Sequence, residues 1–111
     1  MIEDTRLELD GRAIRAVTVE LPKTRLVILA TETGYLMCGA LDVSLLDDLL
    51  GDRRVVAGRS LGVRSYQDLL ERPLDRVTAA ARDLGITPGM KGREALRRML
   101  AAEEAAVKPR A

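Results

Sequence analysis

Apolar and polar residues alternate along the first part of the chain. Residues 5–9 place a leucine at every second position near their end, and a period of two is typical of a β-strand with one buried face. Asp10-Gly11 favours a two-residue hairpin turn. Residues 12–21 predict a second strand, in which Ile14 and Arg15 fall out of phase and indicate a bulge. Pro22 ends this strand because proline cannot donate to a sheet ladder.

The next apolar segment shows no alternation. Residues 26–30 are all apolar, which indicates a strand that is buried on both faces. In a chain this small, such burial requires helices on one face and another covering on the second, for which a second subunit is the natural candidate. A turn at Thr33-Gly34 then leads into a fourth expected strand, residues 35–38.

A strand–loop–helix pattern follows, and it occurs twice in succession. Residues 35–50 and 55–70 each run from an apolar stretch, through a small-residue loop, into an amphipathic segment ending in Asp-Leu-Leu. Because a helix links their strands, residues 35–38 and 54–57, we expect these strands to pair in parallel. Two glycine-bearing loops would then meet at one edge of the sheet, where open α/β arrangements commonly bind ligands.

The remaining sequence predicts helices with recognisable ends. Ser65, followed three residues later by Asp68, is typical of an N-cap and begins a short helix. Pro73 opens a third helix, whose apolar residues recur at helical spacing until Gly85 stops it. The last helix begins near Gly92.

Together these elements predict an α+β fold. Its parts are an N-terminal antiparallel β-meander of about four strands, a β-α-β-α unit and two C-terminal helices. With 111 residues in the chain, we expect one domain over residues 1–107 and a frayed tail at residues 108–111.

The composition determines what the core can be made of. The chain has no phenylalanine or tryptophan and only two tyrosines, although 47% of its residues are hydrophobic. The core must therefore consist of Leu, Val, Ile, Ala and Met, which bury less area per residue than aromatic side chains. Such a core is thin in a chain of this length, and thin cores are often stabilised by association.

Charge and the remaining composition exclude several classes of protein. The 18 basic and 17 acidic residues give a net charge of +1, without the basic face of a general nucleic-acid binder. No apolar stretch approaches the roughly 18 residues of a membrane span, and the N-terminal residues do not resemble a signal peptide. With a single cysteine and no internal disulfide, we expect a cytoplasmic protein.

Histidine is absent from the chain. This excludes a Ser-His-Asp triad, a Cys-His pair and any imidazole metal ligand. A zinc site of the usual type would also need more than one cysteine. We therefore expect neither a metal nor a cofactor.

Cys38 and Asp42 are the candidate catalytic residues. Cys38 ends a predicted strand four residues before a helix, whose dipole can lower the pKa of a thiol and make it nucleophilic, with Asp42 as its proton partner. In the alternative interpretation, Cys38 is a small buried hydrophobic residue and Asp42 is a helix cap. The sequence leaves both open.

Residues 58–64 are the best candidate for anion binding. Their two glycines leave backbone amides accessible, and their two arginines supply positive charge just before a helix. The segment lacks both the Walker ending and the dinucleotide-binding glycine pattern, and the alternative is a turn with solvated arginines. The predicted ligand-binding residues are Gly39, Gly58, Arg59, Ser60, Gly62 and Arg64.

A third glycine-containing segment resembles a DNA-binding turn. Residues 85–96 are similar to the hairpin of helix-hairpin-helix proteins, but their glycines are too widely spaced and only one copy occurs. Because the net charge is close to neutral, nucleic acid is not an expected partner. We interpret the segment as a connection between two helices.

The segment Gly34–Asp42, with the sequence GYLMCGALD, resembles the YunC-like family of small bacterial and archaeal proteins of unknown function. Residues 16–24, 57–64 and 84–96 also fall within the resemblance, which covers nearly the whole chain. It implies an α+β domain whose β-rich N-terminal part, about residues 1–34, mediates tetramerisation. The family has no established activity, so no catalytic residue is carried over.

Three functions therefore compete. The preferred one is a homo-oligomeric protein that binds an anionic small molecule at glycine loops after two parallel strands. The second is a small enzyme that uses Cys38 with Asp42. The third is a module for assembly or partner binding, in which the glycine loops are only tight connections.

Overall fold

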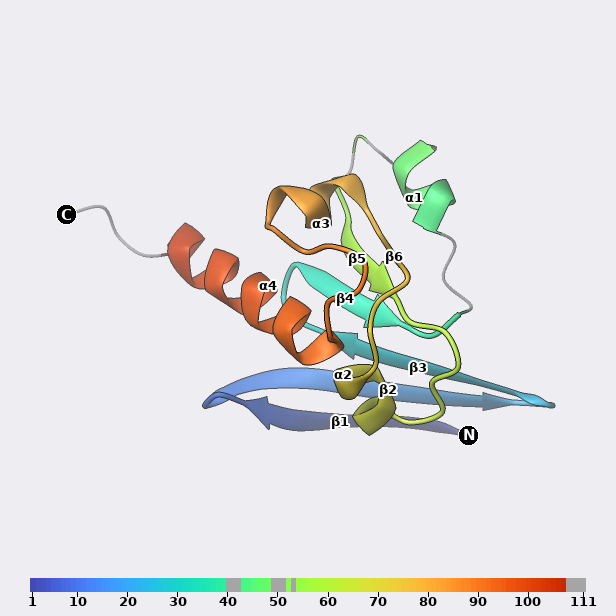
Figure 1. The fold of residues 1–111 in the computed structure, drawn as a ribbon. Helices are drawn as coiled ribbons and strands as arrows, with labels where there is room; N and C mark the ends of the chain where they lie inside the picture. Colours follow the sequence, from blue (N-terminus) through green and yellow to red (C-terminus); the bar gives the residue numbers. More distant parts are fainter. Residues whose placement is uncertain (40–42, 49–51, 53, 108–111) are drawn as a thin grey trace.

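Six strands in the described part of the chain form one sheet, in the order in which they follow one another (Figure 1). The computed structural model describes residues 1–39, 43–48, 52 and 54–107. The strands are β1 (Ile2–Leu9), β2 (Arg12–Leu21), β3 (Thr24–Ala30), β4 (Gly34–Met37), β5 (Val56–Arg59) and β6 (Arg76–Val77). Neighbours are antiparallel, except that β4 and β5 are parallel as the sequence predicts.

Helices cover the sheet unequally. Those described are α1 (Val43–Asp48), α2 (Tyr66–Glu71), α3 (Ala79–Asp83) and α4 (Gly92–Val107). Helices α2 and α4 contact each other and pack against β3 and β4, on the face that we call the inner face. Helix α1 lies on the opposite, outer face, where Val43 and Leu46 pack against Ala57 of β5. The predicted α+β fold class is confirmed, with β6 as an unexpected sixth strand.

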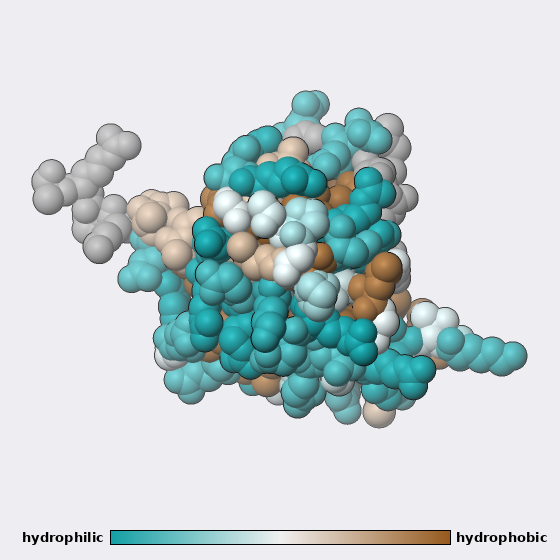
Figure 2. Space-filling model, viewed as in Figure 1, coloured by the Kyte–Doolittle hydropathy of each residue, from teal (hydrophilic) through white to brown (hydrophobic). Residues whose placement is uncertain are grey.

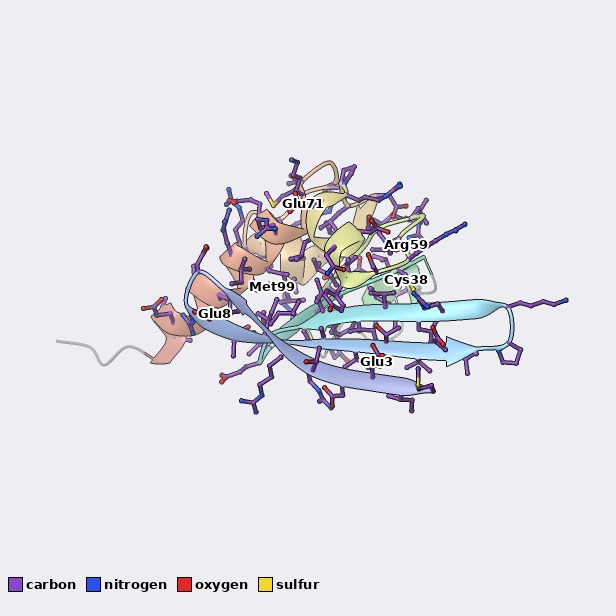
Figure 3. All side chains as sticks on the ribbon, turned by 90° about the horizontal axis from the view of Figure 1, so that it is seen from below. Glu3, Glu8, Cys38, Arg59, Glu71 and Met99 are labelled. Carbon is purple, nitrogen blue, oxygen red and sulfur yellow. The ribbon has the colours of Figure 1, made fainter. Side chains whose placement is uncertain are left out.

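The main core lies between the inner face and the helices. Met99 of α4 points toward the sheet (Figure 3), so closely that a Cβ added at Gly34 would lie 2.9 Å from its sulfur. Tyr66 of α2 packs against this core and is only partly buried, so aliphatic side chains fill most of it. Burying each large aliphatic residue contributes about 2 kcal/mol. The largest fully buried apolar residues described are Val27, Leu29, Leu36, Leu69, Leu74, Ile86, Leu96 and Met99.

Strand β2 presents a different face to the core from the one its valines indicate. Ile14 and Ala16 are buried, whereas Val17 and Val19 lie on the outer face and are partly exposed. Leu7 pairs with Ile14, and the register runs without interruption along the whole hairpin. The predicted bulge is therefore wrong, because a continuous ladder places Ile14 beside Leu7 on the inner face.

Strand β3 is buried on only one face within a single chain. Val27 and Leu29 have no exposed surface, whereas Leu26 and Ile28 point the other way and remain partly exposed. No described helix covers the outer face of β1, β2 and β3, which Figure 3 shows at the front. We call the partly exposed residues there the outer sheet face; they are Val17, Val19, Leu26, Ile28 and Ala30.

The predicted third helix from Pro73 is wrong. Pro73 forms an isolated bridge with Lys91, and residues 76–77 form the edge strand β6 on β5. The helix in this region, α3, starts only after Thr78, whose side chain accepts a hydrogen bond from the backbone N–H of Ala81 and caps it. Pairing with β5 replaces the helical turns that the apolar spacing indicates.

Other predicted boundaries agree or shift slightly. Ser65 caps α2, because its hydroxyl accepts a hydrogen bond of 3.2 Å from the backbone N–H of Asp68, and α4 begins at Gly92; both predictions are confirmed. Strand β5 lies two residues later than the predicted 54–57, which moves Gly58 from a loop into a strand. Among the described helices, none has both the length and the apolar character that crossing a membrane requires.

Candidate functional site

The loops after β4 and β5 meet at one corner of the sheet. The backbone N–H of Ser60 donates to the carbonyl oxygen of Met37 at 3.1 Å. Leu61 lies against Gly39, since a Cβ added there would be 3.1 Å from Leu61 Cδ2. Parallel strands end at the same sheet edge, and this brings together two loops that are about twenty residues apart in the sequence.

Gly58 does not belong to either loop. It lies inside β5 opposite Leu36, and it is buried. A Cβ at this position would lie 2.9 Å from Leu74 Cδ1 and 3.2 Å from Leu36 Cδ2. The residue has to be small because two leucines pack over it, and its place in the predicted ligand loop is therefore corrected to a core position.

Arg59 is engaged with an acidic residue of the next segment. Its Nε and Nη2 donate to the two carboxylate oxygens of Asp75 at 3.0 and 2.6 Å. The hydrogen bonds from Arg59 lower the pKa of Asp75 below its ordinary value, despite the opposing effect of burial. Such two-point pairing holds the guanidinium in place, so Arg59 joins β5 to the segment that leads into β6.

Ser60 is fully buried. Its hydroxyl donates to the carbonyl oxygen of Pro73 at 3.0 Å. This hydrogen bond holds the loop after β5 against the segment that precedes β6. The hydroxyl thus has a defined structural role at the floor of the corner.

Cys38 is buried at the same corner and directly follows Met37, which pairs with Arg59 in the sheet; Cys38 and Arg59 are labelled in Figure 3. Its Sγ lies 3.9 Å from the carbonyl oxygen of Arg25, and its backbone N–H donates to Val27. Asp42, its predicted proton partner, lies outside the described residues. The surroundings of the thiol are those of a small core residue.

Gly62 and Arg64 lie on the exposed side of the loop. Gly62 has a φ of +74°, a conformation that favours glycine. The backbone N–H of Arg64 donates to the carboxylate of Asp68 at 3.1 Å. Its carbonyl oxygen accepts a hydrogen bond of 3.1 Å from Arg25 Nη1. Both bonds involve the backbone of Arg64 and hold it in place. The guanidinium of Arg64 takes part in neither bond and is exposed.

An open groove of about 660 Å³ lies between this loop and the β2–β3 hairpin. The hairpin projects beyond the helices (Figure 1), and Figure 2 shows hydrophobic residues at the surface near where it joins the body. Arg64 is the only predicted ligand residue that lines the groove. The lining residues are Glu20, Leu21, Lys23, Thr24, Arg25, Val63 and Arg64.

The groove is positively charged overall, with three basic side chains and one acidic. Arg25 forms an ion pair with Glu20, which neutralises both. Lys23 and the guanidinium of Arg64 have no hydrogen-bond or ion-pair partner among the residues that the structure describes. These two cations are therefore available to an incoming anion.

Lys23 and Arg25 were missed by reasoning from sequence. They lie in the β2–β3 hairpin, where Arg25 precedes Arg64 by 39 residues in the sequence. No glycine motif marks this hairpin as part of a binding site. The signal that could have found them is the antiparallel pairing of β3 with β4. It places the first residues of β3 next to the last residues of β4.

The described residues offer no metal centre. Nowhere among them do three or more Cys, Asp or Glu side chains gather in a way that could hold a metal ion.

Three comparisons relate the chain to known proteins. A family described as "Domain of unknown function (DUF1805)" matches residues 37–99. The "Uncharacterized protein YunC" of Bacillus subtilis (strain 168) is 52% identical over 100 residues, 90% of this chain and 99% of that protein. A protein of unknown function from Thermoplasma acidophilum, TA1206, is similar in its crystal structure with a TM-score of 0.79. The similarity covers 88% of this chain and 92% of that one, and at 24% identity it shows the fold alone.

Proposed function

This chain belongs to the DUF1805 family of unknown function, and from its geometry we propose that it is a homo-oligomeric protein that binds a small anionic molecule. The resemblance to the YunC-like family seen in the sequence is confirmed. The proposed site is the groove between the β2–β3 hairpin and the loop after β5. A cytoplasmic location is part of the proposal and rests on the sequence alone.

One observation carries the anion site. Three basic side chains and one acidic line a single groove, and the acidic one is already paired with Arg25. Lys23 and Arg64 then face the groove as uncompensated cations. Arginine and lysine in such positions attract carboxylates and phosphates through charge-assisted hydrogen bonds.

The proposed site differs in part from the one predicted from sequence. Arg64 remains in it, and Gly39 and Gly62 shape the loops beside it. Arg59 and Ser60 have partners of their own in Asp75 and Pro73. In the proposed site, Lys23 and Arg25 line the groove in place of Arg59 and Ser60.

An enzyme that uses Cys38 has less support. The thiol is 6% exposed and lies beneath the loop rather than in the groove. A catalytic thiol has to be reached by its substrate and has to be present as thiolate. The buried position favours a packing role.

Titration with inorganic phosphate tests the anion site. Phosphate should raise the melting temperature of the full chain, because a ligand that binds only the folded state stabilises it. Arg64→Gln should weaken phosphate binding roughly tenfold, the effect of losing one charge-assisted contact. Arg82→Gln removes the same charge from an exposed position on α3 and should leave binding unchanged. If Arg64→Gln and Arg82→Gln bind phosphate alike, the groove is not the site.

The outer sheet face supports the proposed homo-oligomer. Aliphatic residues of two adjacent strands are partly exposed there, and Val17 lies directly opposite Ile28. The Arg15–Asp4 ion pair lies beside them on the same face. Exposed aliphatic residues bordered by polar ones are typical of an interface. A second copy would bury β3 on both faces, as its unbroken apolar sequence requires. A tetramer, which the family resemblance implies, is the proposed assembly.

A further inference from the structure

The groove has two halves of different chemistry. Lys23, Arg25 and Arg64 supply the charged half, and Leu21 and Val63 supply an aliphatic half. We infer that its ligand is an amphipathic anion, a carboxylate or phosphate monoester that carries a short aliphatic chain. This inference rests on the proposed anion site and narrows the class of ligand that it takes.

Leu21 is the solvent-exposed member of the aliphatic half. Leu21 is 50% exposed, and Leu61 of the neighbouring loop is 53% exposed, although large apolar side chains usually lose most of their surface on folding. Val63 is buried and forms part of the floor. An aliphatic chain lying on this surface would gain roughly fourfold in affinity for each methylene group that it buries.

The charged half is divided between shaping the groove and binding. Arg25 pairs with Glu20 and donates to the carbonyl oxygen of Arg64. Its guanidinium therefore holds the hairpin against the loop. Lys23 and Arg64 remain to meet the anionic head. One end of the ligand is therefore fixed by charge, and its chain extends toward Leu21.

The backbone at Lys23 fixes where this residue lies beside the groove. Lys23 follows Pro22 in a two-residue turn and has a φ of +57°. Glycine or asparagine is preferred in this second turn position, and a lysine is strained there. Asp10 and Arg54 share this conformation, so the turn does not itself mark the site. At residue 23 it places a cation on the rim of the groove.

The size of the groove agrees with an anion larger than phosphate. Its volume of about 660 Å³ lies within the range of small-molecule sites, about 300–1,000 Å³. A phosphate or carboxylate group alone would occupy only a small part of it. Part of the remaining space lies along Leu21 and Val63, which a head group does not use.

Binding of matched anions tests the inference. Calorimetric titration of the full chain would compare inorganic phosphate with hexyl phosphate, acetate with octanoate, and hexanol as a neutral chain. The alkyl anions should bind at least tenfold more tightly than the simple anions, and hexanol should not bind measurably. Equal binding of simple and alkyl anions overturns the amphipathic ligand and leaves the anion site standing. Binding of neither kind overturns the proposed function itself.

Variants assign the two halves. Leu21→Ser should remove the preference for alkyl chains and retain phosphate binding. Lys23→Gly should weaken the binding of both simple and alkyl anions roughly tenfold. It should also raise the melting temperature, since glycine adopts a positive φ without strain. Arg54→Gly is the control for binding, because Arg54 is a cation with a φ of +52° outside the groove; unlike Lys23, it forms an ion pair, with Asp83. It should leave the affinity for both kinds of anion unchanged. If Lys23→Gly binds the anions as tightly as wild type, Lys23 is not part of the site. If Leu21→Ser still prefers alkyl anions, the aliphatic half does not bind the chain.

Discussion

Glu103 is a buried carboxylate with a complete set of hydrogen-bond donors. It lies on α4 with 7% of its surface exposed. The hydroxyls of Thr31 and Thr33 donate to it at 2.5 and 2.7 Å. The backbone N–H groups of Glu32 and Thr33 do so at 3.3 and 3.2 Å. This one side chain therefore ties the last helix to the turn between β3 and β4.

Stability should depend on the charge of Glu103. Burial alone would raise its pKa, but the four hydrogen bonds outweigh burial and lower the pKa below the ordinary value of 4.5. A lowered pKa in the folded state means that its contribution is present above pH 4.5 and is lost as the pH falls through the folded value. Glu103→Gln should therefore cost roughly 1–3 kcal/mol at pH 7.

Urea unfolding of the wild type and of Glu103→Gln between pH 7 and pH 3 measures the contribution of the Glu103 charge to stability. The difference in free energy of unfolding between wild type and Glu103→Gln should shrink as the pH falls. Glu104→Gln, an exposed neighbour on the same helix, should show a much smaller difference. A gap that stays constant down to pH 3 would contradict the assignment.

Gly92 is a second position where one residue decides the packing. A Cβ at this position would lie 1.9 Å from the carbonyl oxygen of Leu69, so α2 and α4 approach each other only because Gly92 has no side chain. Gly92→Ala should lower the free energy of unfolding by roughly 2–4 kcal/mol, although alanine normally favours helix.

Thermal and urea denaturation measure this effect. Arg98→Ala, at an exposed position of the same helix, is the control and should change stability by less than about 0.5 kcal/mol. A Gly92→Ala protein as stable as wild type would show that α2 and α4 can separate at little cost.

At the scale of elements, the segment after Pro73 shows where local sequence signals stop being sufficient. Its apolar residues recur at helical spacing, yet the backbone N–H groups of Asp75 and Thr78 donate to Arg59 and Ala57 of β5. The hydroxyl of Thr78 donates to the carbonyl oxygen of Val55 at 2.6 Å. Hydrogen bonds to the open edge of β5 outweigh a helical preference that is worth only tenths of a kcal/mol per residue.

Elements defined by short-range signals could be predicted. The hairpin turn at Asp10-Gly11, the cap at Ser65 and the start of α4 at Gly92 each depend on neighbouring residues. The parallel pairing of β4 and β5 follows from the helix between them. The sequence therefore contains the fold class and most of the boundaries.

Features set by long-range pairing could not be predicted. The inward face of β2 depends on its register with β1, and the position of Gly58 depends on Leu36 and Leu74 packing over it. The groove needs the β2–β3 hairpin beside the loop after β5, two segments that are far apart in the sequence. Of the site, the sequence indicated the corner and Arg64 but not Lys23.

At the scale of the whole molecule, the outer sheet face should decide the oligomeric state. Val17→Lys places a charge at the centre of this face, opposite Asp4, which already pairs with Arg15. The variant should shift the protein toward monomer, because burying an additional charged side chain opposes association. Val17→Thr keeps the shape and strand preference and should retain the oligomer.

Light scattering coupled to size-exclusion chromatography at micromolar concentration measures this, with circular dichroism to show that both variants fold. A wild-type protein that is monomeric under these conditions would contradict the proposed assembly. If Val17→Lys has the same molar mass as the wild-type oligomer, the interface does not lie on the outer sheet face.

The sheet order has a consequence for how the chain folds. Because β1 to β4 lie side by side in chain order and are joined by turns of two or three residues, each of these strands can pair with the one before it through a short loop closure. Local pairings of this kind form quickly. The slow, entropically expensive step is then the arrival of α4, whose Glu103 has to find a turn about seventy residues earlier.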